Sequence, residues 1–245
     1  MNNPNGETNR SLTRGATFAL LALLTGIAVT SPAWLVGRAA EKHHPDKDKG
    51  AKHHANATAY RWDLIHVSSQ GTNTVLDAGG VDSDNAADGS LITLTGSGTW
   101  LSIPRRDKPQ AVTGGGTWAA WDKTGTNSTG SGTYRVTRLV SAEVFPGSNS
   151  APGFIDNIGS PEDARGGLIV LRIVYSDGER GVLTVSCHGP ARVPDTVFEG
   201  ITVTKGIVGY VDRVRPAPGV DANRTVFHLL ADVQVDDDDD DDDDP

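Results

Sequence analysis

One short motif is written three times between residues 95 and 134, and it constrains the fold more than any other feature. Residues 95–100 read TGSGTW, residues 113–118 read TGGGTW and residues 129–134 read TGSGTY. Glycine inside a strand commonly marks a bulge or a sharp bend, and the following aromatic side chain covers the space that glycine leaves open. Three consecutive strands of this kind predict a curled antiparallel meander, which suits a closed or nearly closed barrel. A β-sandwich with three glycine-rich turns is the alternative.

The rest of residues 60–235 also follows a strand pattern. Residues 60–67 and 133–140 alternate apolar and polar side chains, while residues 168–175 are nearly all apolar and β-branched. Asp177 and Gly178 separate that run from the apolar residues 182–188, which predicts a hairpin. No long segment shows the 3.6-residue apolar period of a helix. We therefore expect an all-β antiparallel domain of eight to ten strands.

The glycine–aromatic repeat also resembles a known family. Residues 113–140, TGGGTWAAWDKTGTNSTGSGTYRVTRLV, are similar to the meander of the allene oxide cyclase and dirigent barrels, which place Gly-x-Gly before an aromatic residue on successive strands. The resemblance implies an eight-stranded, calycin-like barrel with a central cavity, and it carries over no catalytic residue. The stretches GVLTVSCHGP and VDANRTVFHLL resemble secreted bacterial proteins of unknown function.

The first 33 residues have the pattern of a secretory signal peptide. Arg10 and Arg14 precede an apolar run at residues 15–29, and small residues around Ala33 follow it. Cleavage is expected after Ala33 or after Ala39, with export by the general secretory route to the medium or the cell envelope. An uncleaved anchor is the alternative, but the run is shorter than the roughly 20 residues of a membrane span. No later segment is expected to cross a membrane.

Two polar segments flank the expected domain. Residues 34–59 form a linker whose polar part cannot bury a core and is expected to be disordered. Its two histidine pairs could capture Zn²⁺, Cu²⁺ or Ni²⁺, or the linker could be a plain spacer. Residues 236–245 form a tail of nine aspartates and a proline, which we expect to act as a non-specific polyanion. The candidate transition-metal ligands are His43, His44, His53 and His54.

Charge and cysteine content narrow the possible partners and stabilising bonds. The formal net charge is -9 and the tail carries nine acids, so the remainder of the chain is balanced. A balanced body lacks the basic excess typical of nucleic-acid binding. Cys187 is the only cysteine, so the domain contains no internal disulfide. Residues 77–90 are a candidate Ca²⁺ loop, with Asp82, Asp84 and Asp88 as the expected ligands. A solvated loop without a metal is the alternative.

Four residues are candidates for catalysis. His66 and His228 lie in the first and last expected strands, which are neighbours in a closed barrel, so the two imidazoles could meet. His188 follows Cys187, but adjacent strand residues point to opposite faces, so the pair is not a nucleophile and base. Arg172 interrupts the most apolar strand and either lines the lumen, paired with Glu199 or a bound acid, or points outward.

Two classes of function follow from these features. A secreted binding or structural module, which holds a small apolar ligand in the barrel, agrees with the balanced body and the lack of a catalytic motif. A cavity enzyme of the cyclase or isomerase kind is the alternative, and extracellular metal binding is another. A lumen filled with tryptophan and valine would favour the module. The aromatic residues expected to line the ligand cavity are Trp62, Trp100, Trp118 and Tyr134.

Overall fold

The protein is described by a computed structural model that covers residues 54–102, 112–148, 152–189, 193–212 and 223–236. Strands dominate these residues, and one short 3₁₀ helix, η2 (Pro161–Asp163), interrupts them. The strands are β1 (His54–Gln70), β2 (Asn73–Ala78), β3 (Asp82–Asn85), β4 (Leu91–Leu94), β5 (Ser97–Ser102), β6 (Gly115–Trp121), β7 (Ser128–Phe145), β8 (Phe154–Asp156), β9 (Ala164–Tyr175), β10 (Arg180–Cys187), β11 (Gly200–Lys205), β12 (Val208–Tyr210) and β13 (Thr225–Asp236).

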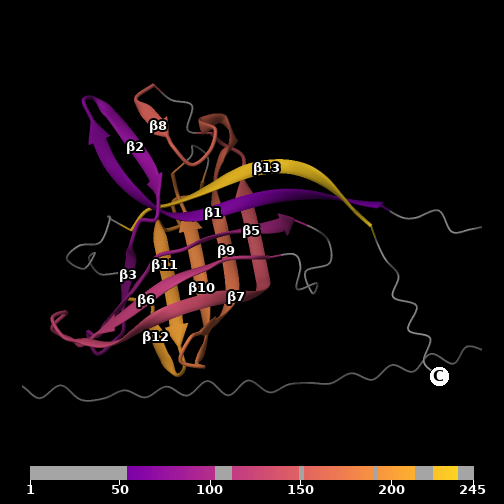
Figure 1. Cartoon of the computed structure of the whole chain (residues 1–245). Helices are drawn as coiled ribbons and strands as arrows, with labels where there is room; N and C mark the ends of the chain where they lie inside the picture. Colours follow the sequence, from indigo (N-terminus) through magenta and orange to yellow (C-terminus); the bar gives the residue numbers. More distant parts are fainter. Residues whose placement is uncertain (1–53, 103–111, 149–151, 190–192, 213–222, 237–245) are drawn as a thin grey trace, which may run out of the picture. The chain divides into compact units, whose positions relative to one another are not determined.

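Six of the thirteen strands pair in a ring. β1 pairs with β5 and β13, β6 pairs with β5 and β7, and β9 pairs with β7 and β13, all antiparallel. β10, β11 and β12 extend the sheet beyond β9, and β4 and β3 extend it beyond β6 (Figure 1). The predicted all-β antiparallel fold is confirmed. The predicted eight to ten strands were too few, because β2, β3 and β8 are short strands that the apolar pattern did not reveal.

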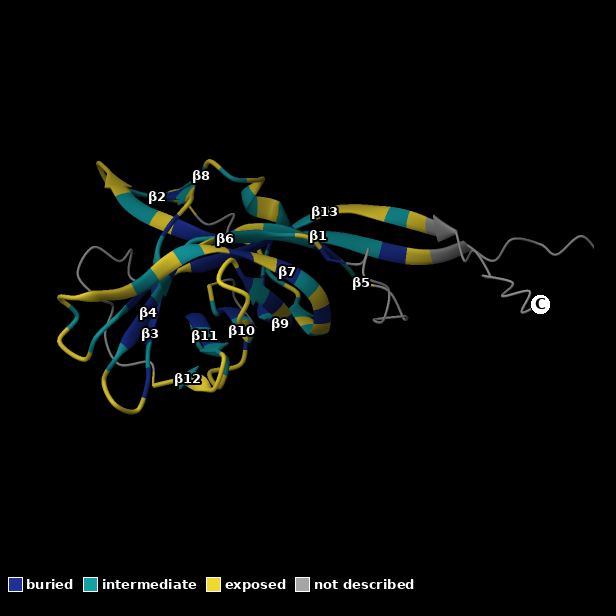
Figure 2. Cartoon of the chain, turned by 60° about the horizontal axis from the view of Figure 1, so that its bottom comes forward, coloured by how far each residue is buried: buried dark blue, intermediate teal, exposed yellow. Residues whose placement is uncertain are grey.

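The inner face of the sheet is filled by large side chains. The main buried cluster joins Leu64, Ile92, Ile169, Leu183 and Phe227 from strands far apart in the sequence. Figure 2 shows buried residues in dark blue on several strands of the sheet. The four aromatics expected to line a ligand cavity belong to the same cluster, and their exposed fractions are small. These fractions are Trp62 0 %, Trp100 1 %, Trp118 5 % and Tyr134 4 %.

The glycines of the repeats allow backbones to approach one another. A Cβ atom on Gly116 would lie 1.9 Å from the carbonyl oxygen of Thr95, and one on Gly98 would lie 2.2 Å from the carbonyl oxygen of Thr113. The first two copies therefore pack backbone against backbone where β5 meets β6, and these strands share a single ladder pair there, Ser97 with Gly115. Only glycine permits this approach, so the repeat is architectural.

Aromatic side chains cover the glycines, but they come from neighbouring strands and not, as predicted, from the residue that follows each glycine pair. Trp62 lies against Gly98 and Gly114, and the hydroxyl of Tyr134 lies over Gly96. Tyr134 also donates a hydrogen bond of 3.0 Å to the Thr95 carbonyl. The aromatic residue of one strand thus closes the surface opened by glycines on its neighbours.

Two predicted boundaries were wrong. β1 begins at His54, so residues 54–59, assigned to the disordered linker, form strand instead. They are stabilised by antiparallel pairing with the end of β13, which continues to Asp236, and Ala57 is buried. The poly-aspartate segment therefore begins inside the last strand. The rest of the linker and tail lies outside the described residues.

Candidate ligand-binding pocket

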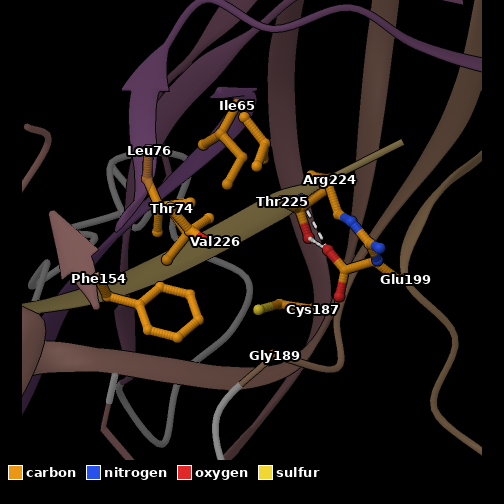
Figure 3. A pocket seen from close by; sticks show the side chains of 11 residues that line it. Ile65, Thr74, Leu76, Phe154, Cys187, Gly189, Glu199, Arg224, Thr225 and Val226 are labelled. Atoms are coloured by element: carbon orange, nitrogen blue, oxygen red, sulfur yellow. Dashed lines mark hydrogen bonds between the residues drawn. The ribbon is translucent and has the colours of Figure 1, made fainter. Parts of the chain in front are cut away.

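A pocket of about 280 Å³ lies beside the hairpin of β1 and β2, and Figure 3 shows the side chains that line it. Apolar side chains make most of its wall, and a carboxylate and an arginine stand at one end. Its lining residues are Ile65, Val67, Thr74, Leu76, Phe154, Cys187, Gly189, Glu199, Arg224, Thr225 and Val226.

A change of partner along β1 creates this pocket. The first part of β1 pairs with β5 and β13 as far as Leu64, and from Ile65 onward the strand pairs with β2. Side chains alternate between the two faces of a strand. Leu64 therefore enters the main core, while Ile65 packs in a second cluster with Leu76 and Val226. The pocket borders this second cluster.

β8 supplies the outer wall. It pairs with β2 in parallel, with Thr74 opposite Phe154 and Leu76 opposite Asp156. Phe154 keeps 42 % of its surface exposed while its ring faces the pocket (Figure 3). An exposed aromatic edge beside buried aliphatic side chains is typical of a site that accepts an apolar group.

Glu199 forms the polar end. Its Oε2 accepts a hydrogen bond of 2.7 Å from the His188 backbone N–H, and its Oε1 accepts one of 2.8 Å from the Thr225 backbone N–H. Burial raises the pKa of Glu199, although these two hydrogen bonds and the charge of Arg224 oppose the rise. Arg224 is exposed and its side chain extends beside Glu199 (Figure 3).

Cys187 lies in the wall as an apolar group. It is 1 % exposed, and burial raises the pKa of its thiol to about 12. A protonated, enclosed thiol is a poor nucleophile. Cys187 is therefore not a nucleophile, which agrees with the prediction that Cys187 and His188 do not form a nucleophile and base.

The two predicted strand histidines do not meet. His228 faces Arg61 across the β1–β13 ladder, whereas His66 pairs with Asp77 in β2 and is exposed. The separation arises because β1 leaves β13 after Leu64, a change of partner that a simple barrel does not contain.

His228 instead connects β13 to β8 through a side-chain hydrogen bond. Its Nε2 donates to the Oδ2 of Asp156 over 2.9 Å, and both side chains are almost completely buried. Burial alone would raise the pKa of Asp156, but the hydrogen bonds from His228 and from the backbone N–H of Ile158 and Gly159 hold it below its ordinary value. Gly159 packs directly on the imidazole ring. This pair supports the pocket wall and does not open into the pocket.

A second buried acid lies nearby on β1. Asp63 is 0 % exposed and accepts two hydrogen bonds of 2.7 Å from Arg61. Burial raises the pKa of Asp63, and the guanidinium opposes that rise. A fork of this kind satisfies both carboxylate oxygens, which a buried carboxylate requires. Arg61 and Asp63 are therefore structural.

The other predicted catalytic residues are dispersed. Arg172 is exposed on the outer face of β9, so the prediction that it lines the lumen was wrong. Glu199 does not pair with Arg172 and lies in the pocket instead. The neighbours of Arg172 in β9, Leu171 and Ile173, are buried. Because side chains alternate between the two faces of a strand, Arg172 points outward. His188 is half-buried just after β10 and contributes its backbone N–H to Glu199.

The predicted Ca²⁺ loop does not form. Asp82 and Asp84 are buried in β3, opposite Leu94 and Ile92, whereas Asp88 is exposed and binds the N–H and hydroxyl of Ser90. Within the ranges that the structure describes, no three His, Cys, Asp or Glu residues are placed to hold a metal ion. The strand pairing separates the three aspartates. His43, His44 and His53 lie outside the described residues, as does the side chain of His54.

Sequence reasoning did not predict that the residues that define the pocket would meet. Phe154 lies in residues 142–167, a stretch rich in proline and glycine, and its aromatic ring was the available signal. Glu199 and Arg224 precede β11 and β13, at strand ends where polar residues are common. The pairing of β2 with β8 places Phe154 at the pocket, and hydrogen bonds from His188 and Thr225 hold Glu199 there.

Comparison with known proteins finds no matching family model, no similar curated protein and no similar solved structure. In the part of the chain that the structure describes, no helix is long and apolar enough to span a bilayer.

Proposed function

We propose that this chain is an exported binding module that holds a small, largely apolar ligand in the pocket beneath β2 and β8. The observation that carries the proposal is the pocket itself, a space of about 280 Å³ with apolar walls and one polar end. This size is close to the lower bound of small-molecule sites. The apolar run at residues 15–29, after Arg10 and Arg14, supports export.

The polar end defines the ligand class. Glu199 already accepts two backbone hydrogen bonds, and Arg224 provides a cation at the rim. A ligand with an apolar body and one hydrogen-bonding group fits this arrangement, since the body would cover Leu76, Val226 and Phe154. Burial of that body provides the main driving force.

Binding fits the chemistry of the pocket better than turnover does. General acid–base catalysis needs a titratable group within hydrogen-bond reach of the substrate. Cys187 holds its proton, and His228 is occupied by Asp156 outside the pocket. Glu199 lines the pocket, but each of its carboxylate oxygens already accepts a backbone hydrogen bond. His66 and Arg172 lie on other surfaces, so the residues proposed for an isomerase do not form one site.

Native mass spectrometry of the purified protein, followed by titration with the apolar fluorescent probe N-phenyl-1-naphthylamine, tests the proposal. Thr74 points into the pocket, so Thr74→Phe should fill it and weaken probe binding by about tenfold, which corresponds to about 1.4 kcal/mol. Asn73→Phe is the matched control, because adjacent strand residues point to opposite faces. Equal probe binding by both variants would contradict the proposal.

A further inference from the structure

We propose that four arginines on the outer face of β7, β9 and β10 bind the poly-aspartate segment, residues 236–244, of a second copy of this chain. This inference is independent of the ligand pocket. The arginine face, as we define it, consists of Arg135, Arg138, Arg172 and Arg180.

The register gathers these arginines in two adjacent rows. Arg138 lies directly opposite Arg172, whose other neighbour is Val182. Arg135 and Arg180 lie on either side of Val174, two residues further along β9. Directly opposed side chains in an antiparallel pair have Cβ atoms about 5 Å apart. Four positive charges therefore share one small area of the sheet.

A bulge in β7 is what places two of the arginines together. Arg135 and Arg138 are three residues apart, a spacing that puts side chains on opposite faces of a regular strand. The register shifts between Val136 and Arg138, and the buried residues change from Tyr134 and Val136 to Leu139. The extra residue turns both arginines outward.

The face is exposed and its charges are not neutralised within the described residues. All four arginines are exposed, and none of them forms an ion pair with a described carboxylate. Arg138, Arg172 and Arg180 line an open groove of about 500 Å³ together with Thr137, Val182 and Thr204. Like charges directly opposed across a ladder are destabilising unless an anion lies between them.

The aspartate segment matches this face in charge and spacing. It supplies nine carboxylates, while the rest of the chain has no net charge. In an extended segment, carboxylates on one side repeat about every 6.8 Å, which is also the distance between adjacent outward rows of the sheet. One extended segment that lies along the strands in the groove would place one carboxylate beside each of the two arginine rows.

The direction of β13 indicates a second copy as the source. Phe227 pairs with Arg165, and from there β13 runs toward Asp236 while β9 runs the opposite way toward Arg172. Measured along the strands, about 50 Å separates Asp236 from Arg172, and nine extended residues span about 30 Å. Nine residues are therefore too short to reach the arginine face of their own chain, and a second copy is needed to supply the carboxylates.

Sedimentation velocity at 20 mM and 300 mM NaCl tests the inference on the purified chain. We expect concentration-dependent association at 20 mM that weakens at least about tenfold at 300 mM, because exposed charge pairs are screened. Deletion of residues 236–244, or the double substitution Arg138→Glu and Arg172→Glu, should each leave a monomer. Lys123→Glu, on an exposed turn away from the arginine face, should associate like the parent chain.

A mixing experiment identifies the interacting parts. The deletion variant keeps an intact arginine face and the double variant keeps an intact tail, so the two should associate with each other although neither associates alone. Circular dichroism and a thermal scan show whether the double variant is folded, and Arg172→Gln provides a milder loss of charge. A parent chain that stays monomeric at 20 mM, a deletion variant that still associates, or a mixture that remains monomeric would each overturn the inference.

Discussion

Gly116→Ala tests whether the glycine repeat closes the ring by backbone contact. The added Cβ would lie 1.9 Å from the Thr95 carbonyl oxygen, 2.6 Å from its carbonyl carbon and 2.8 Å from the Cα of Gly96. All three atoms are backbone, so no flexible side chain can move to make room. Gly116 has an ordinary φ, which means that the effect is steric and not conformational.

The magnitude follows from overpacking. An extra methyl group in a close-packed region destabilises a protein by about 1–3 kcal/mol, and a clash with backbone belongs at the upper end. We expect Gly116→Ala to lower the free energy of unfolding by about 3 kcal/mol. In a domain of this size that corresponds to a fall in Tm of roughly 6–12 °C.

Urea denaturation followed by tryptophan fluorescence measures this change, because Trp62, Trp100 and Trp118 are buried in the folded state. Gly209→Ala is the matched control, since its Cβ would meet nothing within 4 Å, and it should shift stability by less than about 0.5 kcal/mol. Gly130→Ala should fall between them, because its Cβ would lie 3.1 Å from the end of the Trp118 ring. If Gly116→Ala behaved like Gly209→Ala, the argument for close backbone contact would be refuted.

Three further predictions concern buried polar groups. Asp156→Asn should destabilise the fold by about 2 kcal/mol at pH 7, because it removes the charged acceptor of hydrogen bonds from buried His228 and from the backbone N–H of Ile158 and Gly159. The folded-state pKa of Asp156 is lowered, so its stabilisation is complete above the ordinary value of 3.8 and is lost as the pH falls through the lower pKa. Urea titrations of both proteins should therefore converge in acid, and a constant gap would contradict the assignment. Cys187 should resist a thiol reagent at pH 8 in the native protein and react fully in guanidinium, and fast native labelling would show an accessible thiolate. Tyr134→Phe should lose about 1 kcal/mol by urea denaturation, because the Thr95 carbonyl loses its 3.0 Å hydrogen bond, and a neutral effect would mean that the bond adds nothing.

Strand identity was predictable where periodicity was strong. Residues 168–175 were expected as a strand and lie in β9, and the hairpin expected at Asp177 and Gly178 joins β9 to β10. The short strands β3 and β8 were not predicted. Asp82, Asp84 and Asp156 are polar residues in these strands, and their placement depends on partners elsewhere in the chain.

The candidate site was much less predictable than the fold. His66 and His228 were expected to meet because they lie in the first and last strands. They do not meet, because β1 changes its partner from β13 to β2 before it reaches His66. The pocket instead combines Phe154 of β8 with Glu199 and Arg224, which lie in the connections before β11 and β13. Their proximity comes from long-range pairing, about which local residue patterns carry no information.

The sequence by itself determined the all-β character, the close backbone packing at the repeated glycines and the opposite faces of Cys187 and His188. These features are local, because they depend only on the alternation of side chains along a strand and on the missing Cβ of glycine. Tertiary structure alone decided which strands pair. It therefore placed Trp62, Trp100, Trp118 and Tyr134 in the buried core and formed the pocket beside the hairpin of β1 and β2. It also decided the side of Arg138, through a bulge that reverses alternation. Register is the physical reason, since a shift of one residue exchanges the two faces of a strand.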